Sequence, residues 1–329
     1  MARAGAVADT PAQRIVDGAP GMDTVRRIAP DRAGAWRRIN LGEDTMKLLR
    51  YGPAGQESPG LLDDDGHIRD LSQHVPDIDG NMLGADRLRA LSKLDTSELP
   101  IVEGAPRLGP PVANPGKILG IGLSYADHAA EAGMDLPEEP IVFSKVPTAL
   151  SGPNDPVMIP RGSEKTDWEV ELAFVIGRQA LYVEKDEALD YVAGYAVMND
   201  VSERAYQLEG SGQFIKGKSF DTFAPMGPWL VTTDEVPSPM NLKLWLDRNG
   251  KRRQDSSTSN MVFAIDYLVS YLSGFMTLMP GDIITTGTPP GVGMGCKPPE
   301  FLEPGDVMSL GVEGLGEQKQ DVVAWSAGG

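Results

Sequence analysis

Two glutamates, Glu169 and Glu171, stand two residues apart in the segment DWEVELAFVIG. Side chains two apart in a β-strand point to the same face of the sheet, so both carboxylates are expected on one face. Apolar Ala173 and Val175 continue that face, which indicates that it enters a core. Carboxylates buried side by side need a cation or a shared proton between them. The alternative is a half-buried strand that turns its polar face to solvent.

A third carboxylate, Asp200, follows the apolar run GYAVMN. At the end of a strand, a loop can direct such a side chain back at the sheet. Three carboxylates, with further positions left for water, suit a hard divalent cation, Mg²⁺ with Mn²⁺ as the alternative. Taken alone, Asp200 would be interpreted as a helix or turn cap. Together with the two glutamates it predicts a metal site formed by Glu169, Glu171 and Asp200.

His128 and Glu131 form a second candidate pair, in the segment YADHAAEAG. This segment is expected to be a short helix, in which residues three apart share a face. A histidine oriented by a carboxylate can take a proton from water near neutral pH. The alternative is an exposed surface histidine that makes an ordinary contact with Glu131.

The composition limits the classes of partner. The chain has 329 residues and a net charge of −17, which disfavours binding to nucleic acid or to an anionic membrane surface. An anionic substrate would therefore need a metal or placed lysines and arginines. The lone Cys296 fits a reducing compartment, so a cytoplasmic location is expected, and no apolar stretch is long enough to span a membrane.

Three regions follow one another along the chain. Residues 1–45 are rich in Ala, Gly and Arg without a sustained period, and Met46 then begins a strand-like segment, MKLLRYG. We interpret residues 1–45 as a start placed too far upstream or a disordered extension. The acidic residues among them argue against a targeting peptide. Residues 46–112 are predicted to form a small α+β domain, and residues 113–329 the catalytic domain.

The pattern of elements favours an α+β protein that is mainly β. Short apolar runs separated by Gly and Pro turns predict strands, with hairpin turns at Asp65-Gly66 and Asn249-Gly250. Helical spacing of apolar residues predicts helices within 83–94 and 261–278. Strands and helices do not alternate regularly, which disfavours a doubly wound parallel sheet.

Five segments in this order and spacing resemble the fumarylacetoacetate hydrolase family. They are SYADHAAE, DWEVELAFVIG, NDVSERAYQ, KSFDTFAPMGPW and TGTPPGVG. The resemblance covers roughly residues 115–323. The start MKLLRYGPAGQESPGLLDDDG also resembles the small N-terminal domain of bacterial members, among them 2,4-diketo-3-deoxy-sugar-acid hydrolases and ureidoglycolate lyases.

The resemblance implies a mixed β-sandwich roll, a homodimer, and a metal held by Glu169, Glu171 and Asp200. It also implies that the His128–Glu131 dyad is catalytic and that Lys218 reaches the metal. The resemblance further implies that five residues contact the substrate: Ser124, Arg204, Gln207, Lys218 and Thr288. For Arg204 the alternative is that it braces the acidic cluster. For Thr288 the alternative is that its segment is simply a turn that requires glycine.

The activity implied is Mg²⁺-dependent hydrolysis of the C3–C4 bond of a small anionic 2,4-diketo acid. A 3-deoxy-2,4-diketo sugar acid, such as the rhamnonate or fuconate derivative, would give pyruvate and a second acid. Decarboxylation of oxaloacetate, isomerisation of a 2-hydroxyhepta-diene-dioate and ureidoglycolate cleavage are alternatives that use the same site. A non-catalytic metal-binding or sugar-binding module is the alternative from a different class.

Overall fold

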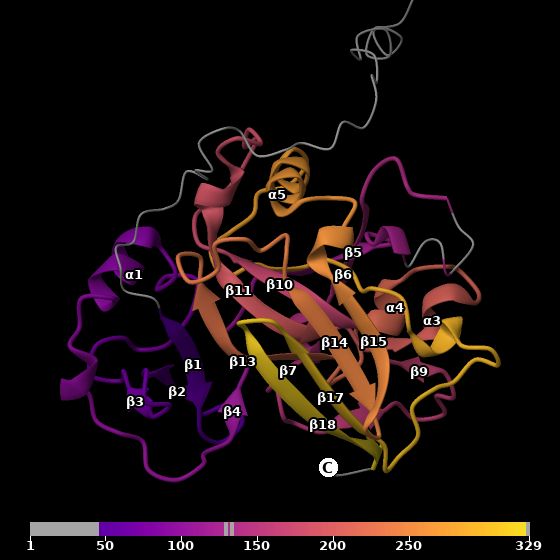
Figure 1. Ribbon diagram of the computed structural model, residues 1–329, viewed down its shortest axis with the longest axis horizontal. Coiled ribbons are helices and arrows are strands. Elements are labelled where there is room, and N and C mark those ends of the chain that lie inside the picture. Colours follow the sequence, from indigo (N-terminus) through magenta and orange to yellow (C-terminus); the bar gives the residue numbers. More distant parts are fainter. Residues whose placement is uncertain (1–45, 128–130, 132–134, 327–329) are drawn as a thin grey trace, which may run out of the picture. The chain divides into compact units, whose positions relative to one another are not determined.

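The computed structural model describes residues 46–127, 131 and 135–326 (Figure 1). Within these residues, the larger sheet has eleven strands, mostly antiparallel. They run in the order β3 (Ile68–Asp70), β2 (Ser58–Leu62), β1 (Lys47–Tyr51), β13 (Ala224–Thr232), β11 (Val192–Asn199), β10 (Val170–Ile176), β16 (Ile283–Thr285), β5 (Ile118–Gly122) and β6 (Ile141–Lys145), with β4 (Leu108–Gly109) beside β1 and β7 (Leu150–Ser151) beside β13.

A second sheet of five strands packs against the first, as Figure 1 shows for β14, β17 and β18 in front of β10, β11 and β13. Its order is β15 (Lys251–Ser257), β14 (Lys243–Arg248), β17 (Val307–Val312), β18 (Gly316–Ala324) and β8 (Val157–Ile159). A separate two-stranded pair joins β9 (Thr166–Asp167) to β12 (Ser202–Glu203). The mainly β, α+β fold that the sequence predicts is confirmed.

The helices are short and lie outside the sheets. They are α1 (Ala85–Leu91), α3 (Arg204–Leu208), α4 (Ile215–Lys218) and α5 (Ile265–Ser273), with single 3₁₀ turns at Thr96–Glu98, Pro147–Ala149, Ala188–Tyr191, Thr258–Asn260 and Gly293–Gly295. Both predicted helices within 83–94 and 261–278 are present, as α1 and α5. Among the described residues, none of the helices has the length and hydrophobicity that a membrane crossing requires.

Both predicted hairpins are also confirmed. Strands β2 and β3 flank the Asp65-Gly66 turn, and β14 and β15 flank Asn249-Gly250, where Asn249 adopts a left-handed φ of 53°. Asn tolerates this conformation better than most residues, which explains why the turn forms there. The division at residue 112 stays a prediction; β1, from the N-terminal part, pairs directly with β13.

The centre of the larger sheet is buried on both faces. Every residue of β10 and β11 is buried, which is typical of strands covered on two sides. The strands pair antiparallel, with Val170 opposite Asn199 and Phe174 opposite Tyr195. This pairing brings the residue before β10, Glu169, next to the residue after β11, Asp200.

A glycine in this centre gives the first testable prediction. A β-carbon at Gly194 in β11 would overlap the carbonyl oxygen of Val231 in β13. We expect Gly194→Ala to lower the free energy of unfolding by about 1–3 kcal/mol, because a packed sheet must shift to admit it. Gly84→Ala is the matched control, since no heavy atom lies within 4 Å of a β-carbon there, and its effect should stay within about 0.5 kcal/mol. Urea denaturation measures both, and equal effects would contradict the prediction.

Candidate metal centre

The three predicted metal ligands lie together in the interior. Glu169 precedes β10, Glu171 belongs to it, and Asp200 follows β11. Each offers one carboxylate oxygen, and these oxygens all lie within 4.8 Å of one another. The backbone N–H of Asp200 donates to the carbonyl of Glu169 at 2.9 Å, so the pairing of β10 and β11 fixes their separation. The three residues are 6%, 1% and 0% exposed, respectively.

Strand β16 and the loop after it hold Glu171. The hydroxyl of Thr285 and the backbone N–H of Gly287 both donate to Oε2 of Glu171, the latter at 2.8 Å. Donors on a single oxygen orient the carboxylate and aim its second oxygen in a fixed direction. The segment 285–287 thus supports the metal centre, and Gly287 also borders a cleft.

Two buried lysines contact the acidic cluster. Lys218, at the end of α4, places Nζ 2.8 Å from Oε2 of Glu169 and 2.5 Å from Oδ2 of Asp200. Lys145, at the end of β6, places Nζ 2.5 Å from Oδ1 of Asp200 and 3.2 Å from the carbonyl of Val201. Both oxygens of Asp200 therefore accept from an ammonium group, one from each lysine.

Arg204 braces the cluster from the side of α3. Its Nη1 lies 2.6 Å from Oε1 of Glu169 and also donates to Oε1 of Gln207 at 3.0 Å. Its Nε donates to Asp167 at 2.9 Å, and Asp167 also accepts from the backbone N–H groups of Gly293 and Met294. The guanidinium is thus committed to protein carboxylates, which is the bracing role that the sequence left open.

The carboxylates differ in how readily they ionise. Burial, together with the charges of Asp200 and Glu169, raises the pKa of Glu171 well above its ordinary value. Burial also opposes the ionisation of Glu169, but Lys218 and Arg204 outweigh it and hold the pKa of Glu169 below its ordinary value. Burial opposes the charge of Lys218 too, but the adjacent Asp200 and Glu169 leave the pKa of Lys218 raised.

A cleft of about 170 Å³ opens onto the cluster. Six of the predicted site residues line it, whereas Asp200, which contacts Lys218, is not among the lining residues. The lining residues are Ile121, Gly122, Leu123, Phe143, Glu169, Glu171, Arg204, Gln207, Leu208, Phe214, Lys218, Gly287, Thr288 and Met294.

Two predicted substrate contacts are engaged with the protein itself. The hydroxyl of Thr288 donates to the carbonyl of Val170 at 2.9 Å and accepts from Nε2 of Gln254 at 2.7 Å. The buried hydroxyl of Ser124 donates to the carbonyl of Thr286 and is not among the residues that line the cleft. The structure thus gives both hydroxyls a part in shaping the loop that follows β16.

Of the predicted catalytic dyad, Glu131 lies within the described residues and His128 lies outside them. Glu131 accepts from the backbone N–H of Gly291 at 3.2 Å and 3.1 Å through its two oxygens. This contact ties Glu131 to the glycine-rich loop.

Lys145 is a site residue that the sequence patterns did not reveal. A lysine at the end of the apolar strand segment IVFSK is unusual for a buried position, and that was the available signal. Its partner Asp200 is 55 residues away, so no local pattern connects the two. Thr285, which holds Glu171, was missed for the same reason.

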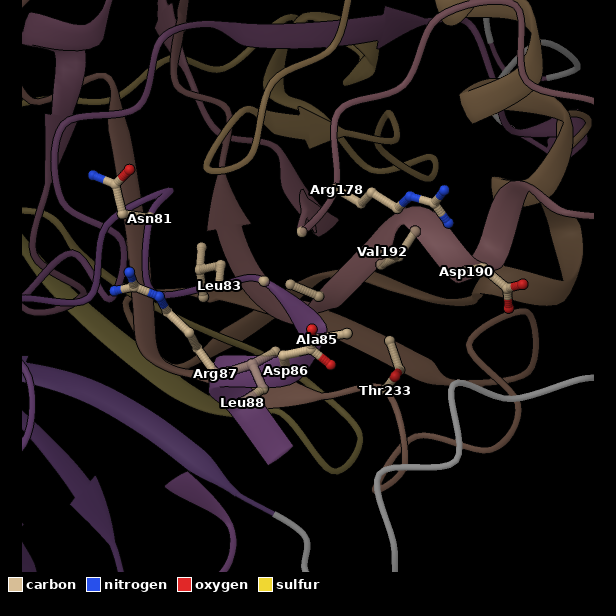
Figure 2. Close-up of a pocket in the computed structure, with 13 residues that line it drawn as sticks. Asn81, Leu83, Ala85, Asp86, Arg87, Leu88, Arg178, Asp190, Val192 and Thr233 are labelled. Atoms are coloured by element: carbon tan, nitrogen blue, oxygen red, sulfur yellow. The ribbon is translucent and has the colours of Figure 1, made fainter. Parts of the chain in front are cut away.

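Two other features lie outside this centre. A larger pocket of about 550 Å³ is lined by α1 and by residues around the ends of β10 and β11, including Arg87, Arg178 and Asp190, and it contains none of the clustered carboxylates (Figure 2). A second group of potential ligands, Asp63, Asp65 and His67, lies in the exposed turn between β2 and β3. In that turn, Asp63 already accepts from backbone N–H groups and from Arg69.

Comparison with known proteins assigns this arrangement to a family. Residues 117–323 match the family described as the C-terminal domain of fumarylacetoacetate (FAA) hydrolase, and this range contains the whole acidic cluster. The chain belongs to the fumarylacetoacetate hydrolase family. The resemblance seen in the sequence is therefore confirmed, and the members of this family are enzymes.

The relatives of this family member carry several activities in their names. A Burkholderia lata protein, named only as a hydrolase, is 61% identical over 84% of this chain and 98% of its own length. A Mycobacterium abscessus structure named as a 2-hydroxyhepta-2,4-diene-1,7-dioate isomerase is 34% identical, with a TM-score of 0.74 over 86% of this chain and all of that one. A maleylpyruvate hydrolase from Sphingobium sp. SYK-6, solved with manganese(II) and pyruvate, is 29% identical, with a TM-score of 0.71 over 85% of this chain and all of that one.

The residues present fit a divalent metal ion. Three carboxylates from two adjacent strand ends offer hard oxygen donors at mutually compatible distances, as Mg²⁺ and Mn²⁺ prefer. Four buried carboxylates (Asp167, Glu169, Glu171 and Asp200) lie among three buried cations (Lys145, Arg204 and Lys218), so the fully ionised cluster has one negative charge in excess. Burial, and then the charges of Asp200 and Glu169, raise the pKa of Glu171. A divalent cation would offset that excess.

The excess negative charge of the cluster predicts that metal binding releases a proton. A carboxylate whose pKa is raised keeps its proton to higher pH, and it must lose that proton to ligate a metal. Affinity for Mn²⁺ should therefore rise with pH and fall as the pH drops through the pKa of Glu171. Calorimetric titration with Mn²⁺ in buffers of different ionisation enthalpy counts the protons released.

Variants identify the source of that proton. Glu171→Gln should bind Mn²⁺ at least about tenfold more weakly and should lose most of the proton release. Asp65→Asn, which alters the other acidic group, is the control and should leave both quantities unchanged. If Asp65→Asn weakens binding and Glu171→Gln does not, the metal site has been placed in the wrong part of the molecule.

Proposed function

We propose that this chain is a divalent-metal-dependent hydrolase that cleaves the C3–C4 bond of a 2,4-diketo acid, giving pyruvate and a second carboxylic acid. The observation that supports it is the convergence of Glu169, Glu171 and Asp200 beside Lys218 at the floor of a small cleft. A relative of the same fold, the maleylpyruvate hydrolase, is named as a complex with manganese(II) and pyruvate. Pyruvate is the product that this reaction would leave beside the metal.

Each residue then has a defined part. Glu169, Glu171 and Asp200 would hold Mg²⁺ or Mn²⁺, which supplies a Lewis acid for the carboxylate and the C2 carbonyl oxygen of the substrate. Lys218 places a positive charge beside the same oxygen, where negative charge develops as the bond breaks. Lys218 and Arg204 favour the ionised form of Glu169, and Lys145 holds the carboxylate of Asp200 in position.

The water that attacks needs a base. We assign this part to His128, on the strength of its sequence motif, with Glu131 orienting the imidazole. His128 takes a proton from water as the oxygen bonds to C4. The C3–C4 electron pair then moves towards the C2 oxygen, and C3 finally takes up the proton that His128 removed from water. One water is consumed, and the products are pyruvate and the acid that contains C4.

The choice among related reactions depends on the base. Isomerisation is the second candidate because one similar structure carries the name of a 2-hydroxyhepta-2,4-diene-1,7-dioate isomerase. Oxaloacetate decarboxylation and ureidoglycolate cleavage remain alternatives from the sequence. A 3-deoxy-2,4-diketo sugar acid remains the substrate that the sequence resemblance favours.

Pyruvate release is the direct measurement. We expect the metal-loaded protein to release pyruvate from acylpyruvates, and EDTA to abolish turnover. Glu169→Gln should lower kcat/KM by at least about a hundredfold, because it removes one metal ligand and the partner of Lys218. Glu98→Gln, an exposed glutamate in a 3₁₀ turn, is the control. Full activity of Glu169→Gln, or of wild type in EDTA, would refute the proposal.

The base is tested separately. His128→Ala should lower kcat for hydrolysis by about 10²–10⁴-fold, the usual contribution of a general base, and leave Mn²⁺ affinity unchanged. The exposed His74→Ala serves as its control. The same variants are assayed with oxaloacetate and with a 2-hydroxydiene dioate. If His128→Ala retains hydrolysis, the base has been misassigned. If wild type turns over oxaloacetate or the diene dioate faster than acylpyruvates, and His128→Ala leaves that turnover intact, decarboxylation or isomerisation becomes the better assignment.

A further inference from the structure

Apolar side chains make up much of the lining of the cleft. Phe143 and Phe214 form one wall of it, with ring centroids 5.8 Å apart, and four more apolar side chains also line the cleft. These are Ile121, Leu123, Leu208 and Met294. Among the described residues that line the cleft, the cationic groups are Arg204 and Lys218, and both are already bonded to the acidic cluster.

This lining indicates what the far end of the substrate can be. A second carboxylate would enter an apolar surface without a cation to receive it, which costs free energy. A chain of hydroxyl groups, as in a sugar acid, would find few polar partners there besides Gln207. An apolar acyl group would instead remove its own surface and that of the wall from water. The lining therefore favours an alkyl or similar apolar group beyond C4.

The two phenylalanines also divide two cavities. The cleft over the carboxylates has about 170 Å³, well below the roughly 300–1,000 Å³ of a site for a drug-sized ligand. A neighbouring pocket of about 510 Å³ is lined by Phe143 and Phe214 as well, together with Ile141, Ile215 and Met276. The two phenylalanines thus separate the two cavities, and the cleft over the carboxylates ends at their rings.

The wall is held in place by its surroundings. Phe143 in β6 lies opposite Gly120 in β5, where any β-carbon would overlap its ring. The ammonium of Lys218 lies 4.8 Å from the centroid of the same ring, a cation–π contact. Phe214 is half-buried and immediately precedes α4. Phe143 is therefore the fixed side of the wall, and Phe214 is the side that can be trimmed with less effect on the cluster.

We propose that the Phe143–Phe214 pair limits the length of an apolar acyl group in this site, so that short acylpyruvates are substrates, while long-chain acylpyruvates and those with a second carboxylate are excluded. The identity of the 2-oxo acid head group depends on the proposed function, whereas the length limit depends on the position of Phe143 and Phe214 between the two cavities. The apolar substrate is thus the structure-based alternative to the sugar acid that the sequence resemblance favours.

Binding of stable analogues tests the length limit without turnover. N-alkyl oxamates carry a carboxylate next to a carbonyl, like a 2-oxo acid, and an alkyl chain of chosen length. Calorimetry with the Mn²⁺-loaded full chain should show N-ethyl oxamate binding at least about tenfold more tightly than N-hexyl oxamate. N-(2-carboxyethyl) oxamate should bind more weakly than N-butyl oxamate, because its second carboxylate meets the apolar wall.

Phe214→Ala should join the two cavities and reverse the preference for short chains. N-hexyl oxamate should then bind at least about tenfold more tightly than it binds wild type, with about a fourfold gain per methylene added along the series. Phe214→Leu should fall between the two. Phe275→Ala, the same truncation at an exposed phenylalanine outside both cavities, should keep the wild-type order. Mn²⁺ titration and thermal melting of each variant confirm that it is folded.

The outcomes separate the two proposals. If wild type binds the oxamates irrespective of chain length, or if Phe214→Ala and Phe214→Leu both fold and keep the wild-type order, the length limit is wrong while the proposed function stands. Tighter binding of the carboxyethyl compound than of the butyl compound would overturn the apolar assignment. If no oxamate binds the Mn²⁺-loaded protein, both the head-group assignment and the length limit fall.

Discussion

The structure depends on keeping several negative charges close together away from water. Four buried carboxylates and three buried cations meet around one point; they are Asp167, Glu169, Glu171 and Asp200 with Lys145, Arg204 and Lys218. Burial of a charge costs several kcal/mol unless it is paired, so each carboxylate needs a partner or a proton. Burial, and then the charges of Asp200 and Glu169, raise the pKa of Glu171. With all seven groups ionised the cluster carries one excess negative charge, and a divalent ion there would make its net charge positive, which suits an anionic substrate.

The fold can be understood as the means of assembling this cluster. Pairing of β10 with β11 brings Glu169 beside Asp200, and pairing of β10 with β16 brings Thr285 to Glu171. The two lysines come from β6 and α4, on separate parts of the chain. Because every contributor sits at the end of an element or beside a buried strand, small errors in strand register would separate the charges. The continuous burial of β10 and β11 enforces that register.

Local sequence patterns predicted the parts of this arrangement that are local. Period-two spacing placed Glu169 and Glu171 together, and Asn-Gly chemistry placed the β14–β15 hairpin. Asp200 was joined to these glutamates by the chemistry of three carboxylates, and the order of five motifs supported the link, because spacing alone says nothing about contacts between distant segments. Lys145 was not predicted because its contact with Asp200 depends on where β6 ends relative to β11. The aromatic wall escaped notice too, since a phenylalanine in an apolar strand is normally interpreted as core.

Strand β6 and helix α4, with the residue before it, carry both the lysines of the metal centre and the phenylalanines of the wall. This arrangement constrains how substrate specificity can change. Phe143 lies two residues before Lys145 in β6, and Phe214 accepts the backbone N–H of Lys218 at 3.1 Å through its carbonyl. A change in the backbone of either element would move a lysine off the acidic cluster. A change confined to the side chain at position 214 leaves that hydrogen bond in place, because the backbone makes it. Selection on substrate length can therefore act on this side chain while the electrostatics of the metal centre stay fixed.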